Sequence, residues 1–465
     1  MQAHFKDRLH HLRSQAKRRT IHRRNIKAQL RRKDERIAQL ERQAEETRRK
    51  YGPTRLHKHR YPVKMIQLAI FIVVIGGGSL RCAAATVEFY AQLMGWSFSR
   101  PSPTTIRDWV MRSGIYALTK RKQLSGDYAV IIDESIQIGK EKLLLLLGVK
   151  LEADFCHCAP LTSADVEVLG MEVQSSWTGE LIASFIKRNL AQCGSLKLAY
   201  LLSDQGSAIL AAVRMLNLNW VSDCSHVMMN AVKRIFGKDK ELSELCAQIG
   251  GLRHQFLLTE WGPILPPTLR SKDRFLRIFT LVPWMERMDS YWSRLPPKVR
   301  RQIGFYQRAW LRRRLTQVHQ LVVLTAEILK RRGLSLSSQH QWQVRVGECL
   351  GGQQLVTAQA RSFVTIMQAY FKAHTAQYDS ARALLCCSDI MEATFGRYKN
   401  KGGMKAISGD VLSLALYNRE LTASFISKAM KQVSCQAVRD WECDNVCHNR
   451  YGLRRRIDKE LKTVT

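Results

Sequence analysis

Three acidic residues stand in places where a carboxylate is costly unless it binds something. Asp133 interrupts an apolar run, DYAVIIDE, and Asp204 ends another, AYLLSD, next to Gly206, where the backbone can turn tightly. Glu392 lies in a helical pattern after a long helical block. A buried carboxylate must be hydrogen-bonded, paired or bound to a metal ion. These residues are therefore the first candidates for chemistry.

Each acid also has a purely structural interpretation. Asp133 could cap the turn at the end of its strand, and Asp204 could cap the helix expected over 207–216. Asp389 followed three residues later by Glu392 is the spacing of a capping box. Neighbouring residues on a strand point to opposite faces, so Asp133 and Glu134 cannot both face one site.

The elements that position these acids alternate from strands to helices. Apolar runs over 128–132, 143–149 and 166–173 predict three consecutive strands. A helix over 178–193 and a strand over 196–202 follow, and then a helix over 207–216, a strand over 218–221 and a helix that ends at Phe236. The order β-β-β-α-β-α-β-α predicts a mixed sheet with helices on its faces.

The composition favours a polyanionic partner. The 465 residues include 74 Lys and Arg against 39 Asp and Glu, a formal net charge of +35. Nucleic acid is the leading candidate, and a membrane surface is second. The apolar segment Met65 to Ile75 is too short to span a bilayer, and the polar N-terminus carries no secretory signal. Without a secretory signal, the twelve irregularly spaced cysteines indicate reduced thiols in a cytoplasm. Cys156-His157-Cys158 and Cys435…Cys443…Cys447-His448 lack the CxxC pair of a zinc site, so buried free thiols are expected in these two clusters.

The N-terminal region divides into two parts. Residues 1–60 form a basic arm in which Leu30, Ile37 and Ala44 repeat every seven residues, so a short coiled coil and a solvated or disordered arm are both open. Residues 61–123 predict three helices and a helix-turn-helix-like DNA-binding domain. A plain three-helix packing module is the alternative. In the third helix, an apolar stripe leaves Arg107 and Arg112 outside as candidates for DNA contact.

Three further segments complete the chain. Residues 124–237 hold the first part of the sheet domain, and 238–385 predict an all-α insertion without a convincing strand. Residues 386–405 carry Glu392 and then a basic ridge, and 406–465 predict a basic, helical C-terminal tail. The ridge supplies further candidates for DNA contact, which are Arg397, Lys399 and Lys401.

The acid-bearing motifs resemble the ribonuclease H-like catalytic domain of DDE transposases and retroviral-type integrases. The resemblance covers about residues 127–401 and is carried by VIIDESIQIG, LLSDQGSAI and CSDIMEATFGRYKNK. In that family the first Asp lies on the central first strand, the second at the end of the adjacent fourth strand, and the Glu on a later helix. Asp133, Asp204 and Glu392 match these places. Residues 238–385 match the helical insertion of some bacterial insertion-sequence transposases.

The resemblance implies a fold, a cofactor and a reaction. The fold is a ribonuclease H-like α/β domain interrupted by the insertion. The cofactor is a pair of Mg²⁺ ions, or Mn²⁺ in their place, held by Asp133, Asp204 and Glu392. Asp223 and His226 are auxiliary candidates, and Asp223 is the rival second acid because it too follows a strand.

The implied function is metal-dependent cleavage and strand transfer at the ends of a mobile element. Its partners would be the double-stranded terminal repeats, the target DNA and further copies of the chain in a dimer or higher assembly. The location would be the bacterial cytoplasm, at the nucleoid. The alternatives are a non-catalytic DNA-binding protein derived from a transposase and another ribonuclease H-like nuclease.

Overall fold

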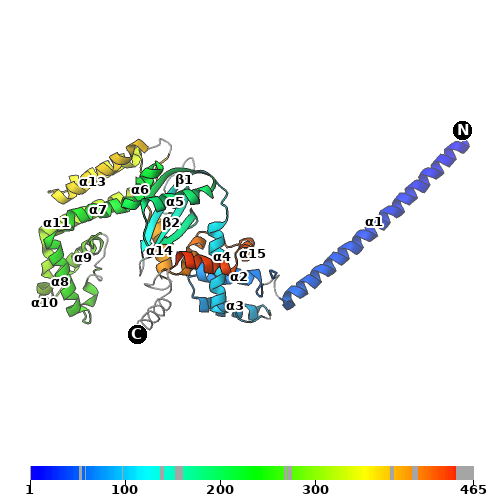
Figure 1. The fold of residues 1–465 in the computed structure, drawn as a ribbon, viewed down its shortest axis with the longest axis horizontal. Helices are drawn as coiled ribbons and strands as arrows, with labels where there is room; N and C mark the ends of the chain where they lie inside the picture. Colours follow the sequence, from blue (N-terminus) through cyan, green and yellow to red (C-terminus); the bar gives the residue numbers. More distant parts are fainter. Residues whose placement is uncertain are drawn as a thin grey trace, which may run out of the picture. The chain divides into compact units, whose positions relative to one another are not determined.

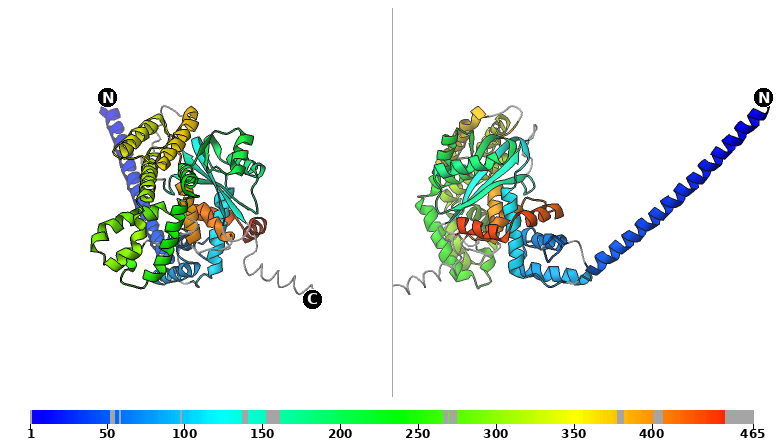
Figure 2. Two further views of the ribbon diagram at one scale, coloured as in Figure 1. Left: turned by 90° about the vertical axis from the view of Figure 1, so that its left-hand side faces the viewer. Right: turned by 45° about the vertical axis from the view of Figure 1, so that its right-hand side comes forward.

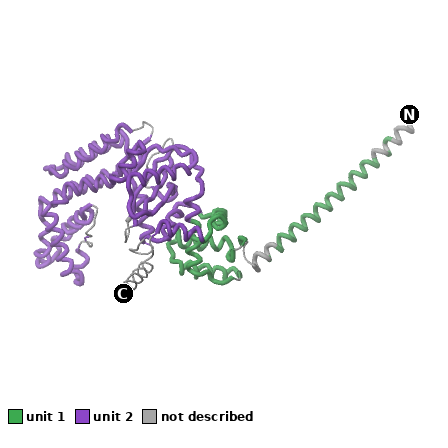
Figure 3. The backbone as a smooth tube through the Cα atoms, in the orientation of Figure 1, with its two compact units in different colours: residues 1–113, 421–435 green, residues 114–420, 436–465 purple. Residues whose placement is uncertain are grey.

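The computed structural model describes residues 2–51, 55–57, 59–96, 98–136, 141–151, 161–265, 269, 275–377, 382–400 and 407–446. The chain forms two compact units, coloured separately in Figure 3. Unit 1 combines residues 1–113 with 421–435, and unit 2 combines 114–420 with 436–465. The predicted acids all belong to unit 2.

A five-stranded mixed sheet forms the centre of unit 2, in the order β3-β2-β1-β4-β5 (Figure 1). Strand β1 pairs antiparallel with β2, and β2 pairs antiparallel with β3. Strands β4 and β5 run parallel to β1 on its other side. The strands are β1 (Leu124–Ile136), β2 (Lys142–Lys150), β3 (Val166–Gln174), β4 (Gly194–Ser203) and β5 (Trp220–Ser222).

The predicted order of elements is confirmed. Helices α5 (Gly179–Ala191), α6 (Ser207–Leu216) and α7 (Cys224–Phe236) alternate with the last strands. Along β1 the side chains of Tyr128, Val130 and Ile132 share a buried cluster with the apolar faces of α5 and α6. These two helices therefore cover one face of the sheet. Because strand neighbours alternate, Ile131 and Asp133 take the opposite face.

In the segment predicted as an all-α insertion, the regular elements that the structure describes are helices joined by turns and loops, with one isolated bridge between Leu334 and Leu384. Two of its helices, α11 and α13, pack against α7, which joins the insertion to the sheet (Figure 2). The helices are α8 (Lys240–Phe256), α9 (Ile278–Tyr291), α10 (Pro297–Ile303), α11 (Ala309–Arg332), α12 (Leu336–Gly351) and α13 (Ala358–His374), with short 3₁₀ turns η1 (Gly262–Ile264), η2 (Trp292–Arg294), η3 (Gly304–Gln307) and η4 (Thr375–Gln377).

The three helices predicted for 61–123 are present as α2 (Val63–Val74), α3 (Leu80–Leu93) and α4 (Pro103–Thr119), and unit 1 contains the first two and α4 as far as Ser113. Gly95 follows α3 with a φ of 64°, a left-handed conformation that glycine adopts without strain. The apolar stripe predicted on α4 is buried, and Trp109 packs edge-to-face on Tyr61 with ring centroids 5.2 Å apart. Trp109 is thus a core residue.

The last described segment contributes to both units. Its 3₁₀ helix η5 (Gly409–Leu416) is buried in unit 2, and the carbonyl oxygen of Leu412 lies so close to Gly114 that a Cβ there would overlap it. Helix α15 (Ala423–Gln432) packs on α2 in unit 1, and α16 (Cys435–Asn445) follows. Two elements of the predicted tail, η5 and α15, are therefore packed parts of the fold.

The structure also describes the N-terminal arm and several of the cysteines. Helix α1 (Gln2–Tyr51) is one continuous 50-residue helix. Cys435 and Cys443 are exposed, so the expectation of buried thiols is wrong for both: they lie on the short helix α16, which buries only Val438. Cys156, Cys158 and Cys447 lie outside the described residues. Within the part of the chain that the structure describes, no helix is long and apolar enough to cross a membrane.

Candidate functional site

The parallel strands bring three acids to one edge of the sheet. Ile131 of β1 is paired with Leu202 of β4, and Asp133 and Asp204 each lie two residues further along. Ser203 of β4 is paired with Ser222 of β5, and Asp204 and Asp223 are the next residues. The carboxyl ends of neighbouring parallel strands are where open α/β sheets bind ligands.

Asp133 is the acid most affected by this crowding. Burial raises the pKa of Asp133 from 3.8 to about 6, and the nearby Asp204 carboxylate contributes to this rise in pKa. Its neighbour Glu134 is paired with Lys142 across the strand at 2.9 Å. As expected for neighbours on a strand, the two carboxylates have different surroundings. Glu134 is paired with a lysine, whereas Asp133 lies near other carboxylates.

Asp204 shapes the turn after β4. Its Oδ1 accepts a hydrogen bond from the backbone N–H of Gly206 at 2.9 Å, and Gly206 itself is the N-cap of α6. The structural interpretation of Asp204 as the cap of this helix is therefore wrong, since no side chain caps α6. Asp204 is partly exposed at the strand end and lies close enough to Asp133 to perturb its pKa.

Asp223 is a structural carboxylate. It is the buried N-cap of α7, and its Oδ1 accepts hydrogen bonds from the His226 backbone N–H at 2.7 Å and from Nδ1 at 3.2 Å. Its Oδ2 accepts from the backbone N–H of Ser388 at 2.6 Å. Burial alone would raise the pKa of Asp223, but these hydrogen bonds outweigh it and lower the pKa. Asp223 therefore ties α7 to the residues just before the Glu392 helix.

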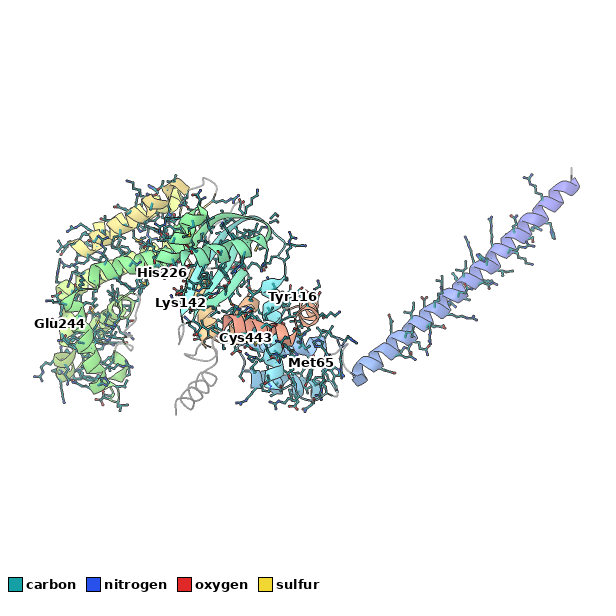
Figure 4. The ribbon with its side chains drawn as sticks, in the orientation of Figure 1. Met65, Tyr116, Lys142, His226, Glu244 and Cys443 are labelled. Carbon is teal, nitrogen blue, oxygen red and sulfur yellow. The ribbon has the colours of Figure 1, made fainter. Side chains whose placement is uncertain are left out.

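His226 links the acids on the sheet to that helix. Its hydrogen bond to Asp223 raises its pKa, and the Asp204 and Asp133 carboxylates raise it further. Figure 4 labels His226 on α7, close to the sheet. A raised pKa favours imidazolium, which balances part of the negative charge at this edge.

Glu392 lies on α14 (Asp389–Asn400), a helix that contacts β1, the strand of Asp133. Glu392 and His226 line one cavity of about 280 Å³. Other walls of this cavity come from α7 and the insertion, and they include Met228, Phe279 and Lys330. The structure thus groups Asp133, Asp204, Asp223 and His226 by electrostatic contact, and it brings Glu392 to the group through the cavity that it shares with His226.

The Asp389 carboxylate, the first member of the expected capping box, contacts two other helices. Its Oδ2 is paired with Nζ of Lys330 at 2.5 Å, and its Oδ1 accepts from Oγ of Ser225 at 3.3 Å. Lys330 comes from the last turn of α11, so an insertion helix is attached directly to the helix of Glu392. Sequence reasoning missed this pair, because 59 residues separate its members and no local pattern joins them.

A double-mutant cycle would measure this attachment. Both residues are partly exposed, so Lys330→Ala and Asp389→Ala should each lower the free energy of unfolding by about 1 kcal/mol. Since each change removes the same ion pair, the double variant should lose about 0.5–1 kcal/mol less than the sum. Urea unfolding of the four proteins measures both quantities. Strict additivity would show that the pair contributes nothing.

The residues predicted to contact DNA have varied environments. Arg112 donates to the carbonyl oxygens of Val433 at 2.7 Å and Met430 at 2.5 Å, so its guanidinium caps the end of α15 within unit 1. Arg107 lies 4.0 Å from Asp108, and the Arg397 guanidinium stacks on the ring of Tyr417.

Lys399 and Lys401 are the other two members of the basic ridge. Lys399 lies over the ring of Phe395, with Nζ 5.9 Å from the ring centroid. Lys401 lies outside the described residues. DNA contact by all five basic residues stays a prediction, and for Arg112 the structure adds a role in holding unit 1 together.

The expected Mg²⁺ site can be compared with the ligand side chains that the structure brings together. Among the described residues, no group of three or more His, Cys, Asp or Glu side chains stands ready to hold a metal ion. Asp133 and Asp204 nevertheless fit one chemically, because their oxygens are hard ligands and because repulsion between them adds to the effect of burial in raising the pKa of Asp133. A divalent cation between them would relieve that repulsion.

A scan with models of protein families and a search of curated proteins each find no match for this chain.

Proposed function

We propose that this protein is a metal-dependent DNA strand-transfer enzyme of the DDE transposase type, with a ribonuclease H-like catalytic domain. The observation that carries the proposal is the meeting of Asp133 and Asp204 at the ends of adjacent parallel strands, with the Glu392 helix packed against β1. A buried carboxylate with a raised pKa, as at Asp133, next to a second carboxylate at a strand edge is a common sign of a functional site.

The topology supports the same proposal. A first acid on the central strand, a second on the adjacent fourth strand and a third on a later helix is the arrangement that the transposase resemblance implies. Strand β1 lies between β2 and β4, and β5 lies one strand further from it. This order favours Asp204 over Asp223 as the second acid, and the hydrogen bonds that occupy Asp223 favour it as well.

In this proposal Asp133, Asp204 and Glu392 hold two Mg²⁺ ions. When bound, the ions activate the attacking oxygen and stabilise the leaving one. The chain's own groups do the rest. His226 balances charge next to Asp223, and Asp223 holds the segment that leads into α14. Lys330 fixes the start of α14 from the insertion side.

Nucleic acid is the proposed substrate because of the chain's charge. A net charge of +35 would draw a polyanion to the protein, with an affinity that falls as salt rises. The basic ridge of Arg397 and Lys399 begins on the helix that carries Glu392. A substrate held there would lie next to the carboxylates on the same helix.

Strand nicking and joining by the full-length chain would test the proposal. The substrates are duplexes taken from the DNA that flanks the coding region, with Mg²⁺, Mn²⁺ or a chelator. Asp204→Asn and Glu392→Gln should each lower the rate by about 10³-fold or more, because several kcal/mol of transition-state stabilisation depend on the ions. Glu180→Gln removes an exposed carboxylate on α5 and is the matched control, with the wild-type rate expected.

Each outcome separates the proposal from its rivals. DNA binding without cleavage in any metal would favour a non-catalytic DNA-binding protein. Cleavage that prefers branched duplexes over defined ends would favour another ribonuclease H-like nuclease. Full activity in both acid variants would refute the assignment of the site.

A further inference from the structure

The exposed face of α1 carries a feature that the proposed chemistry does not use. Apolar residues recur at spacings of four and three along one side of this helix, interrupted once by Lys33. Ile26, Leu30, Ile37 and Leu40 are 42–54% exposed, although each is a residue type that usually becomes buried. A row of this kind on a 50-residue helix is typical of the seam of a coiled coil.

The charges of α1 change where this seam begins. Residues 8–25 contain seven Lys and Arg and neither Asp nor Glu. Residues 26–43 contain Asp34, Glu35 and Glu41 among their basic residues. Two basic helices would repel each other over 8–25, whereas over 26–43 opposite charges are available for pairing. The second segment is therefore the one suited to another copy of itself.

From these observations we infer that residues 26–43 form a parallel two-stranded coiled coil with a second copy of this chain. With Leu30 and Ile37 at a positions, Arg36 is at g and Glu41 at e. In a parallel pair, Arg36 of each copy faces Glu41 of the other, so this contact forms twice. The copies are held by an apolar seam and two interhelical ion pairs.

Lys33 also fits the parallel arrangement. It occupies a d position, next to the e position of Asp34 in the second copy, so its ammonium has a carboxylate partner at the seam. An antiparallel pair that matches Leu30 with Leu40 would instead place Asp34 against Asp34 and Arg36 against Arg36. Like charges in those positions disfavour the antiparallel form. The single polar layer costs stability, and it limits alternative registers.

The test measures self-association of the full-length chain without DNA and without divalent metal. Its result is therefore independent of the proposed catalytic function. Sedimentation over a range of concentrations should show a monomer–dimer equilibrium. Ile37→Lys should weaken association at least about tenfold, because it would bury an ammonium in the seam. Ala28→Lys adds the same charge at an f position, away from the seam, and should leave association within about twofold of the wild type.

A charge exchange tests the orientation. Glu41→Arg should weaken the dimer by opposing Arg36, and adding Arg36→Glu in the same chain should restore it. In an antiparallel pair the double variant would stay weak, since the carboxylates introduced at position 36 of the two copies would face each other. A wild type that remains monomeric, or Ile37→Lys and Ala28→Lys with equal effects, would overturn the inference. Circular dichroism of each variant is the control, and its helical signal should match that of the wild type.

Discussion

Replacing Asp133 by asparagine should make the protein inactive and, at neutral pH, more stable. The pKa of Asp133 is raised from 3.8 to about 6 by burial and by Asp204, so the folded state binds this proton more tightly than the unfolded state. Above pH 6 the ionised carboxylate therefore costs folding free energy, up to about 3 kcal/mol for a difference of this size. Asparagine is uncharged and still accepts the hydrogen bond from the Glu134 N–H through its Oδ1.

The sign of the pH dependence follows from the direction of this pKa. The cost is absent below about pH 4, grows as pH rises from 3.8 to 6, and is complete above 6. Urea unfolding of the metal-free wild type and of Asp133→Asn should therefore give similar stabilities at pH 4 and a more stable variant at pH 8. Loss of stability at pH 8 would show that Asp133 lies outside any cluster of repelling carboxylates.

Glu134→Gln is the control on the same strand. It removes a carboxylate one residue away, but that carboxylate faces Lys142 and takes no part in the proposed site. The variant should keep strand transfer and lose about 1 kcal/mol or less, the value of a partly exposed ion pair. A functional carboxylate that destabilises the fold is a familiar trade of stability for activity.

The second large effect is expected from Asp223→Ala. The carboxylate is buried, and it accepts hydrogen bonds from the backbone N–H and the ring Nδ1 of His226 and from the Ser388 N–H. Removing it leaves three donors without an acceptor, which should cost about 3–5 kcal/mol. Thermal or urea unfolding at pH 7 measures the loss. Because the pKa of Asp223 is lowered, its contribution is present above about pH 4 and disappears only in stronger acid.

Thr178→Ala provides a comparison for this loss. Thr178 caps α5 as Asp223 caps α7, but among the described residues its hydroxyl accepts from a single backbone N–H, that of Leu181. An ordinary cap of this kind is worth about 1 kcal/mol. If Asp223→Ala costs no more than Thr178→Ala and yet abolishes strand cleavage, Asp223 is a metal ligand and the assignment of Asp204 is wrong.

Local patterns in the sequence predict much of this fold. The apolar runs before Asp133 and Asp204 reveal two central strands, and the 3.6-residue periodicity around Trp109 reveals the buried side of α4. Such patterns depend on which side of an element is buried, which neighbours along the chain report. Partners that are distant in sequence leave no periodic trace. The pairing of Asp389 with Lys330 and the hydrogen bonds of Arg112 are of this second kind.

In the candidate site, too, local patterns predict some features and contacts between distant residues decide the others. A polar residue that ends an apolar strand is visible in the sequence, which is why the first two acids could be proposed. Nothing local distinguishes Asp204 from Asp223, because both follow strands and precede helices. The two carboxylates differ in the hydrogen bonds that they accept. The Ser388 N–H that helps to occupy Asp223 is 165 residues away.

Unit 1 is made from two segments that leave the ribosome far apart in time. Helix α2 packs on α15, and the Gln67 amide donates to the carbonyl oxygen of Leu421, 354 residues later. The apolar side of α2 that meets α15 must therefore wait, uncovered, while the sheet and the insertion are translated and begin to fold. A nascent chain halted before residue 421 would carry an unfinished N-terminal module. Chaperone contact during synthesis should accordingly concentrate on this early segment.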